Sequence, residues 1–415
     1  MRAASCSPRV SRHTLSRVRR VALSGLVVGV LLTLGCSSAK PDEGPRERLD
    51  REQARAAAAP PPDRTLPAPA EGIWISRAEL LRLRMSGPAW ERLNEAADGD
   101  LRPRKIADQD SDHDVKTLAV ALVYARTGES SYREKAAEAI AGVVGTEEGG
   151  RTLALGRNLL SYVIAADLID FRAYDPDREA EFRDWLRSVR HEPLGSDAIA
   201  DQTLIGTAER SASNWGGMAG ASRVAVAAYL GDEKDLARAA KVMKGWLGDR
   251  SSYPGIPGPH YGPGDAGKGF HSGGSNEDLS WQADPSRPRG VNPKGSTKQG
   301  HSIDGALPDD MRRGGSFEWP PEYTQYPREA LSGFVPLAEL LHRQGYDVYA
   351  WEDKALLRAA RFLFELERDF PEEDWWEPSV AAYWIINYRY GTSFPVEGRG
   401  LGRNVDWTDW THAPR

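Results

Sequence analysis

The chain has 415 residues, with Lys+Arg 54 against Asp+Glu 60, so its formal net charge is −6. A modest negative charge, with no basic run beyond the N-terminal segment, argues against a nucleic-acid partner. Its cysteines are Cys6 and Cys36, and this excludes a cysteine nucleophile or a cysteine metal site from the rest of the chain.

Residues 1–35 have the features of a bacterial export signal. An arginine-rich stretch precedes an apolar run at residues 21–34, which is too short to be a good membrane span. The sequence Leu32-Thr33-Leu34-Gly35-Cys36 resembles a lipoprotein signal, in which Cys36 would be the lipidated first residue of the mature chain. An ordinary secretory signal cut nearby is the alternative. We expect a periplasmic or cell-surface protein that is attached to the membrane only through this lipid.

Residues 36–70 are rich in Pro, Ala, Arg and Glu. Such a composition buries little apolar surface, which predicts a disordered tether. No second stretch of this kind follows, so we expect one main domain over residues 71–415, and a monomer.

Apolar residues recur at helical spacing along most of this domain, whereas strand patterns are few. The pattern predicts an all-α fold, in which helix pairs joined by short turns form an antiparallel array that closes into a ring or an incomplete helical barrel. The predicted helices span residues 114–126, 132–144, 157–169, 178–189, 214–230, 234–247, 328–344, 353–370 and 379–390.

Residues 248–305 interrupt the helices with a stretch crowded with Gly, Pro, Ser, His and Asn. A segment of this length is too long for a simple connection and is typical of a lid or a binding wall. It contains His260, His271 and His301. The alternative is a floppy insertion without a role.

The next loop carries Arg312, Arg313 and a glycine pair, and Tyr326 follows just before an apolar helix. An arginine holds a carboxylate by two parallel hydrogen bonds. A neighbouring positive charge favours a tyrosinate, which fits a tyrosine for proton transfer. The alternative is an ion-paired loop that caps a helix.

From residue 72 onward the chain resembles the alginate lyase type of polysaccharide lyase. The resemblance rests on the order and spacing of several short motifs, none of which is specific alone. They are Asn214-Trp215-Gly216, the stretch from Asp304-Gly305 to Arg313-Gly314, Tyr326 before Ala330-Leu331, and the supporting residues 122–128, 164–168 and 345–349. The resemblance implies an (α/α) toroid and cleavage of a uronic-acid polysaccharide by β-elimination.

The resemblance also implies the site. Asn214 and Arg313 would neutralise the substrate carboxylate, and Tyr326 would transfer the proton. In the family a histidine follows the asparagine, but Trp215 stands there in this chain, so His260, His271 or His301 is the candidate replacement. An apparent insertion after Arg313 also makes Tyr323 a rival to Tyr326.

We further expect Trp215, Arg312, His271 and Trp319 to contact the substrate, an anionic polyuronide, and we expect no cofactor. A tyrosine acting alone suits syn elimination, which predicts activity on mannuronate or glucuronate linkages rather than guluronate. No metal is expected either. Acidic residues at positions 108–114 alternate as in a calcium loop, but they lack the turn glycine and the closing glutamate of an EF-hand, and helix capping is the alternative.

Two other classes of function stay open. Carboxylates lie near the arginine pair, as a glycoside hydrolase would need, namely Asp309, Asp310, Glu318 and Glu322. A catalytically silent surface lipoprotein that binds glycans is the third possibility.

Overall fold

The structure is a computed structural model that describes residues 60–66, 72–102, 105–195, 203–253, 278–398 and 404–413. All of these belong to one contact unit, residues 44–415. Residues 1–59, with Cys36 among them, lie outside the described ranges, as does His271.

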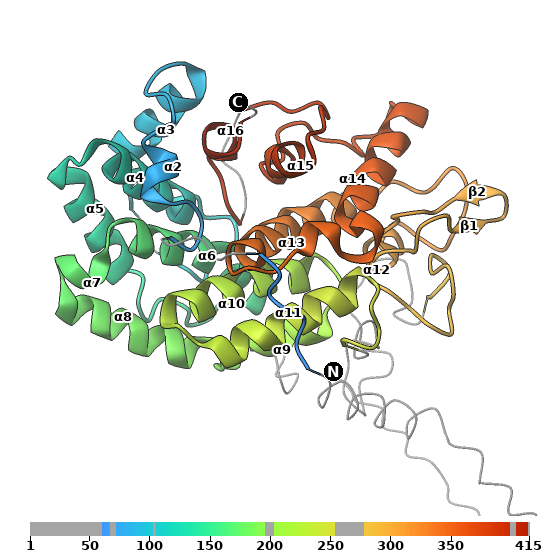
Figure 1. The fold of residues 1–415 in the computed structure, drawn as a ribbon, viewed down its shortest axis with the longest axis horizontal. Coiled ribbons are helices and arrows are strands. Elements are labelled where there is room, and N and C mark those ends of the chain that lie inside the picture. The colour runs from blue at the N-terminus through green and yellow to red at the C-terminus, as the bar shows by residue number, and fades with distance from the viewer. Residues whose placement is uncertain are drawn as a thin grey trace, which may run out of the picture. The chain divides into compact units, whose positions relative to one another are not determined.

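The prediction of an all-α protein is confirmed, since the described ranges contain helices and a single two-stranded hairpin (Figure 1). The first half contains α2 (Arg77–Leu80), α3 (Pro88–Asp98), α4 (His113–Thr127), α5 (Ser130–Ala141), α6 (Thr152–Leu168), α7 (Phe171–Tyr174), α8 (Pro176–Val189), α9 (Leu204–Arg210), α10 (Asn214–Leu230) and α11 (Glu233–Leu247). The second contains β1 (Thr297–Lys298), β2 (His301–Ser302), α12 (Pro308–Met311), α13 (Tyr326–Arg343), η1 (Val348–Ala350), α14 (Trp351–Asp369), α15 (Ala382–Tyr390) and α16 (Thr408–Thr411).

Three helices, α4, α6 and α10, are buried around most of their circumference. Helices that are apolar on every side belong in the interior of a large core. Packing runs from α3 to α4, then to α6, to α10, to α13 and to α15. These contacts make α10 and α13 the central pair, and Figure 1 shows the two ribbons together in the middle of the domain.

A second set of helices covers this core and is amphipathic. Helix α11 is an example, with a buried face that includes Leu236, Val242 and Trp246. The indole N–H of Trp246 donates to the carbonyl oxygen of Ala212 at 2.8 Å. Helix α11 therefore follows the 3.6-residue period from which it was predicted.

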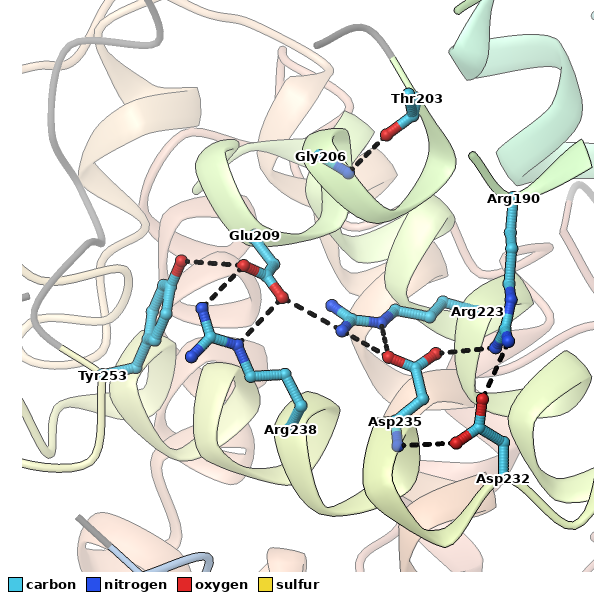
Figure 2. Close-up of polar contacts among 9 residues, drawn as sticks. All are labelled: Arg190, Thr203, Gly206, Glu209, Arg223, Asp232, Asp235, Arg238 and Tyr253. Carbon is cyan, nitrogen blue, oxygen red and sulfur yellow. Dashed lines mark hydrogen bonds and ion pairs between the residues drawn. The ribbon is translucent and has the colours of Figure 1, made fainter. Parts of the chain in front are cut away.

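A charged network, composed of Arg190, Glu209, Arg223, Asp235 and Arg238, ties α9, α10 and α11 together (Figure 2). Arg223 is only 2% exposed and bridges Glu209 at 3.0 Å and Asp235 at 2.6 Å. Each of these carboxylates also pairs with a second arginine: Glu209 with Arg238 at 2.8 Å, and Asp235 with Arg190 at 3.2 Å. Asp232 pairs with Arg190 at 2.8 Å and brings the network to three arginines and three carboxylates. Direct pairing of this kind is the condition under which buried ions are tolerated.

The last described residues return to the first helices. Residues 404–412 are buried almost throughout, and they bond to elements from both ends of the domain. Trp407 Nε1 donates to the carbonyl oxygen of Val115 in α4 at 2.7 Å, and Trp410 Nε1 donates to that of Arg84 at 2.8 Å. Asp409 pairs with Arg92 of α3, and the Asn404 amide donates to the carbonyl oxygen of Ser332 in α13 at 3.2 Å.

Residues 60–66 fall inside the segment predicted as a tether, and they contact the helical domain. The backbone N–H of Leu66 donates to the carbonyl oxygen of Gly345 at 3.0 Å. Arg64 pairs with Glu233 and lies 5.3 Å from the ring centre of Tyr346. Within the described ranges, no helix combines the length and the apolar content needed to cross a bilayer.

Candidate functional site

Helices α10 and α13 run in the same direction and touch at glycines. A Cβ atom on Gly217 would lie 2.7 Å from the ring of Phe334, and one on Gly220 would lie 2.9 Å from Leu337 Cδ2. A Cβ on Gly333 would lie 2.4 Å from the backbone nitrogen of Met218. Positions further along one helix thus face positions further along the other, so both N-termini lie at the same end of the pair.

Asn214 is the first residue of α10, and Tyr326 is the first residue of α13. Ser213 precedes α10 and Gln325 precedes α13, and neither side chain caps its helix by a hydrogen bond. The first N–H groups of a helix need partners and carry a partial positive charge. Two uncapped helix starts at one end of a pair favour negative charge nearby.

Asp310, from the short helix α12, supplies part of the missing cap. The backbone N–H of Asn214 donates to Asp310 Oδ1 at 3.1 Å. Asp310 is only 1% exposed. Burial raises the pKa of the Asp310 carboxyl well above its usual range, and the charge of Asp309 adds to the rise, while the Asn214 N–H and the nearby arginines oppose it. Burial thus disfavours the charged form of this carboxyl.

Arg313 connects this cap to Tyr326. Its backbone N–H donates to the carbonyl oxygen of Asp310 at 3.1 Å. Its guanidinium carbon lies 3.6 Å from the ring centre of Tyr326, in a cation–π stack. Contacts therefore run without a break from Asn214 through Asp310 and Arg313 to Tyr326. We call these residues the candidate site.

The two adjacent arginines differ in their partners. Arg312 is buried and donates through Nε and Nη2 to Asp309 Oδ1, at 2.9 and 2.7 Å. Within the part of the chain that the structure describes, Arg313 forms no ion pair. The charge of Arg312 is already balanced by Asp309, whereas Arg313 keeps a guanidinium that can bind an anion.

Buried polar atoms without a hydrogen-bond partner gather at the candidate site. Asn214 Oδ1, Asp310 Oδ2 and Arg313 Nε are all of this kind among the described residues. Leaving one such atom unpaired costs about 1–3 kcal/mol, so folded proteins keep few of them. Such atoms on neighbouring residues need an explanation, and a role in catalysis is one of the usual ones.

The rival tyrosine lies elsewhere. Tyr323 packs edge-on against Trp375 at 5.3 Å, and its hydroxyl donates to the carbonyl oxygen of Asp374 at 3.5 Å. Burial raises the pKa of Tyr323, which disfavours the tyrosinate that would have to take the proton. The contact with Arg313 belongs to Tyr326.

His301 and Trp319 form a second cluster. Their rings stack with centres 4.6 Å apart and planes 13° apart. His301 lies on the β1–β2 hairpin, and Trp319 lies on the loop between α12 and α13, where it also packs edge-on against Phe370. Trp215 is half-buried, and Arg151 lies 5.6 Å from its ring centre. These residues are placed by aromatic contacts of their own rather than by the contacts that join the candidate site.

The four carboxylates considered for a hydrolase have dissimilar surroundings. Asp309 is bound to Arg312, Asp310 caps α10, and Glu318 and Glu322 are exposed. A glycoside hydrolase needs one carboxylic acid and one carboxylate facing each other across a sugar. None of these contacts sets up such a pair. Within the described ranges, no group of three or more His, Cys, Asp or Glu residues could hold a metal ion.

Two features near the candidate site were not predicted from the sequence. Asp310 was considered only as a hydrolase carboxylate, and its role as a cap joins residues that are far apart in the chain. Arg157 of α6 reaches toward the same end of the helix pair, where it pairs with Glu329 of α13 at 3.2 Å and donates to Met218 Sδ at 3.4 Å. The sequence signal for Arg157 is a lone cation within an otherwise apolar helix.

Comparison of the chain with protein-family models finds no matching family, and comparison with curated proteins finds no match. The resemblance to alginate lyases therefore rests on the short motifs alone.

Proposed function

We propose that the protein is a polysaccharide lyase that cleaves a uronic-acid-containing polysaccharide by β-elimination. The observation that supports this best is the Arg313 guanidinium, which has no ion pair within the described ranges, stacks on Tyr326 and is linked to Asn214 through Asp310. A carboxylate-binding cation next to a group able to move protons is what this reaction needs.

In the reaction a proton leaves C5 of a uronate and the glycosidic oxygen leaves C4. Removing the proton places more negative charge on the existing carboxylate, so that carboxylate must first be neutralised. Arg313 and the side chain of Asn214 would bind it, beside the positive end of α10. Tyr326 would take the proton and return it to the leaving oxygen, a role worth roughly 10²–10⁴ in rate.

We propose syn elimination as the stereochemical course. Trp215 occupies the position where the resembled family has a histidine, and Tyr326 is the proton-transfer group that contacts Arg313. One group can serve when the C5 proton and the C4 oxygen lie on the same side, as in mannuronate and glucuronate. Guluronate needs two facing groups, and His301 of the second cluster is the candidate partner in that case.

We propose further that the helices close into an (α/α) toroid. The succession of contacts from α3 to α15 supports this, as does the return of residues 404–412 to α3 and α4. The parallel course of α10 and α13 also supports it, because parallel inner helices gather their N-termini at one end.

Export and lipidation at Cys36 remain part of the proposal, and they rest on residues 1–36. A blocked lipoprotein peptidase should leave an unprocessed precursor. Normal processing and membrane attachment of Cys36→Ser would contradict lipidation.

The activity is tested with a panel of pure mannuronan, guluronan, glucuronan and glycosaminoglycans, monitored for the ultraviolet absorbance of an unsaturated uronide. A lyase produces this absorbance, a hydrolase produces only new reducing ends, and a glycan-binding protein produces neither. Preferential cleavage of guluronan would contradict syn elimination by Tyr326, and loss of that activity in His301→Ala would then identify the second group.

Arg313→Ala should lower kcat/KM about 10²–10³-fold, because the substrate carboxylate stays uncompensated. Arg313→Lys should restore little, since lysine lacks the planar pair of donors. Arg287 is an exposed arginine in the segment 248–305. Arg287→Ala is therefore the matched control and should behave like the wild type. Turnover by Arg313→Ala near the wild-type rate would refute the assignment.

A further inference from the structure

The geometry points to Asp310 as a positioning residue that caps α10 with an uncharged carboxyl and thereby leaves Arg313 free for the substrate carboxylate. This inference rests on the proposed function for its substrate, but the state of Asp310 can be tested without it. Asp310 touches no reacting atom in the proposal. It acts through Asn214 and Arg313.

The hydrogen bonds of Asp310 determine how these two residues are held. Its Oδ1 accepts the N–H of Asn214 at 3.1 Å, and its backbone carbonyl accepts the N–H of Arg313 at 3.1 Å. One residue thus fixes the start of α10 and the turn that carries the arginine. Without it, the two groups that face the substrate carboxylate would be held by separate segments of the chain.

The charge of Asp310 matters because a carboxylate there would compete with the substrate. The charged groups of its own segment are Asp309, Arg312 and Arg313, of which Asp309 and Arg312 bind each other. The neighbouring helix α13 contributes Tyr326 and Glu329, and the latter is paired with Arg157 of α6. From α10 comes the N–H of Asn214 rather than a charge. An ionised Asp310 would therefore attract Arg313, whose charge no carboxylate of the described ranges pairs with.

Burial favours the uncharged form. Asp310 is 1% exposed and its Oδ2 has no partner among the described residues. A protonated carboxyl keeps Oδ1 as an acceptor for the helix and carries its proton on Oδ2. The cap is thus made without cancelling the charge of Arg313.

Asp310→Asn is the informative variant, because its amide oxygen can still accept the Asn214 N–H while the group can never ionise. Asp310→Ala removes the cap altogether. We expect Asp310→Asn to unfold within about 1 °C of the wild type, and Asp310→Ala to unfold at a clearly lower temperature, as for the loss of a helix N-cap. Equal destabilisation by both variants would overturn the proposal.

The protonation state is read directly by infrared spectroscopy. The difference between wild type and Asp310→Asn at neutral pH should contain the carbonyl band of a protonated carboxylic acid. A carboxylate band in its place would overturn the proposal. This measurement and the unfolding measurement need no substrate, so they still decide the role of Asp310 if no polyuronide is cleaved.

The third measurement is the binding of a mannuronate trimer to the Tyr326→Phe variant, in which turnover is blocked. As the pH rises through the range in which Asp310 ionises, affinity should fall by about tenfold per pH unit, because one proton is linked to binding. In Tyr326→Phe/Asp310→Asn the affinity should stay level over the same range. An equal loss in both would overturn the proposal. If wild type and both variants bind no uronate, it is the proposed function that fails.

Discussion

Replacing Gly333 by alanine tests whether the close contact between α10 and α13 holds the candidate site together. The added Cβ would lie 2.4 Å from the backbone nitrogen of Met218 and 2.5 Å from the carbonyl carbon of Gly217. Ordinary contacts of a Cβ begin at 3.4 Å. Because the obstacle is backbone, the helices themselves must separate, by about 1 Å to restore normal packing.

The expected cost follows from two opposing terms. Overpacking of this kind costs about 1–3 kcal/mol, and the clash with backbone places it at the upper end. Alanine is a better helix former than glycine by about 1 kcal/mol. The net loss in the free energy of unfolding is then about 2 kcal/mol, which corresponds to a fall in Tm of roughly 3–6 °C for a large domain.

Gly220→Ala is the matched control. It adds the same methyl group to the same helix interface, but the nearest atom is Cδ2 of Leu337 at 2.9 Å. The end of a leucine side chain can rotate, so stability should change by less than about 1 kcal/mol. Denaturant unfolding followed by circular dichroism compares the two variants. Equal stability of Gly333→Ala, Gly220→Ala and wild type would refute the close-packing argument.

The same pair of variants separates packing from activity. A displacement of about 1 Å between reacting groups can cost about 10² in rate. Gly333→Ala should therefore lose most turnover at temperatures where it remains folded, whereas Gly220→Ala should retain it.

Three further predictions concern other parts of the molecule. Arg223→Met should lower the free energy of unfolding by about 3 kcal/mol. This is the low end for breaking a buried ion pair, because Glu209 and Asp235 each keep another arginine. Urea unfolding that matches wild type would contradict this. Burial alone would raise the pKa of Glu79, but hydrogen bonds from Arg343 and Ser76 outweigh it and lower the pKa to about 2. The stability that Glu79 contributes is thus present above its usual pKa of 4.5 and is lost as the pH falls toward 2. Glu79→Gln should therefore lower the free energy of unfolding by about 1 kcal/mol near pH 7, after discounting for partial exposure, and by nothing near pH 2. A difference from wild type that stays constant across unfolding curves at several pH values would contradict this. Trp319→Ala should lower kcat/KM on a polyuronide about three- to tenfold, because the ring no longer stacks on the sugar, and Tm should change little. A large drop in Tm instead would show that Trp319 is structural.

Local patterns were sufficient to predict most of the long helices. The interval 214–230 was predicted from its apolar residues and coincides with α10, and the predicted helix at 328–344 lies within two residues of α13. Helix α3 was not predicted. It begins with Pro88 and buries Trp90, Leu93 and Ala97, which stand at i, i+3 and i+7, so the helical spacing was present in the sequence but carried by three residues only.

The candidate site was predicted in part. Asn214, Arg313 and Tyr326 were selected by resemblance, and the structure joins them by contacts. Asp310 was not selected as their link, because a bond between residues 96 apart has no local sequence signal. The difference between Arg312 and Arg313 was also invisible in the sequence, since it depends on which side chain reaches Asp309.

The return of residues 404–412 to α3 and α4 has a consequence for the timing of folding. A ribosome releases the chain from its N-terminus, so the partners of Trp407, Asp409 and Trp410 are made hundreds of residues before these side chains exist. Until residues 404–412 have been made, α3 and α4 lack the indole rings and the carboxylate that complete their packing. Packing of the first helices is therefore completed only after residues 404–412 have left the ribosome, and a partly made chain lacks these contacts until then.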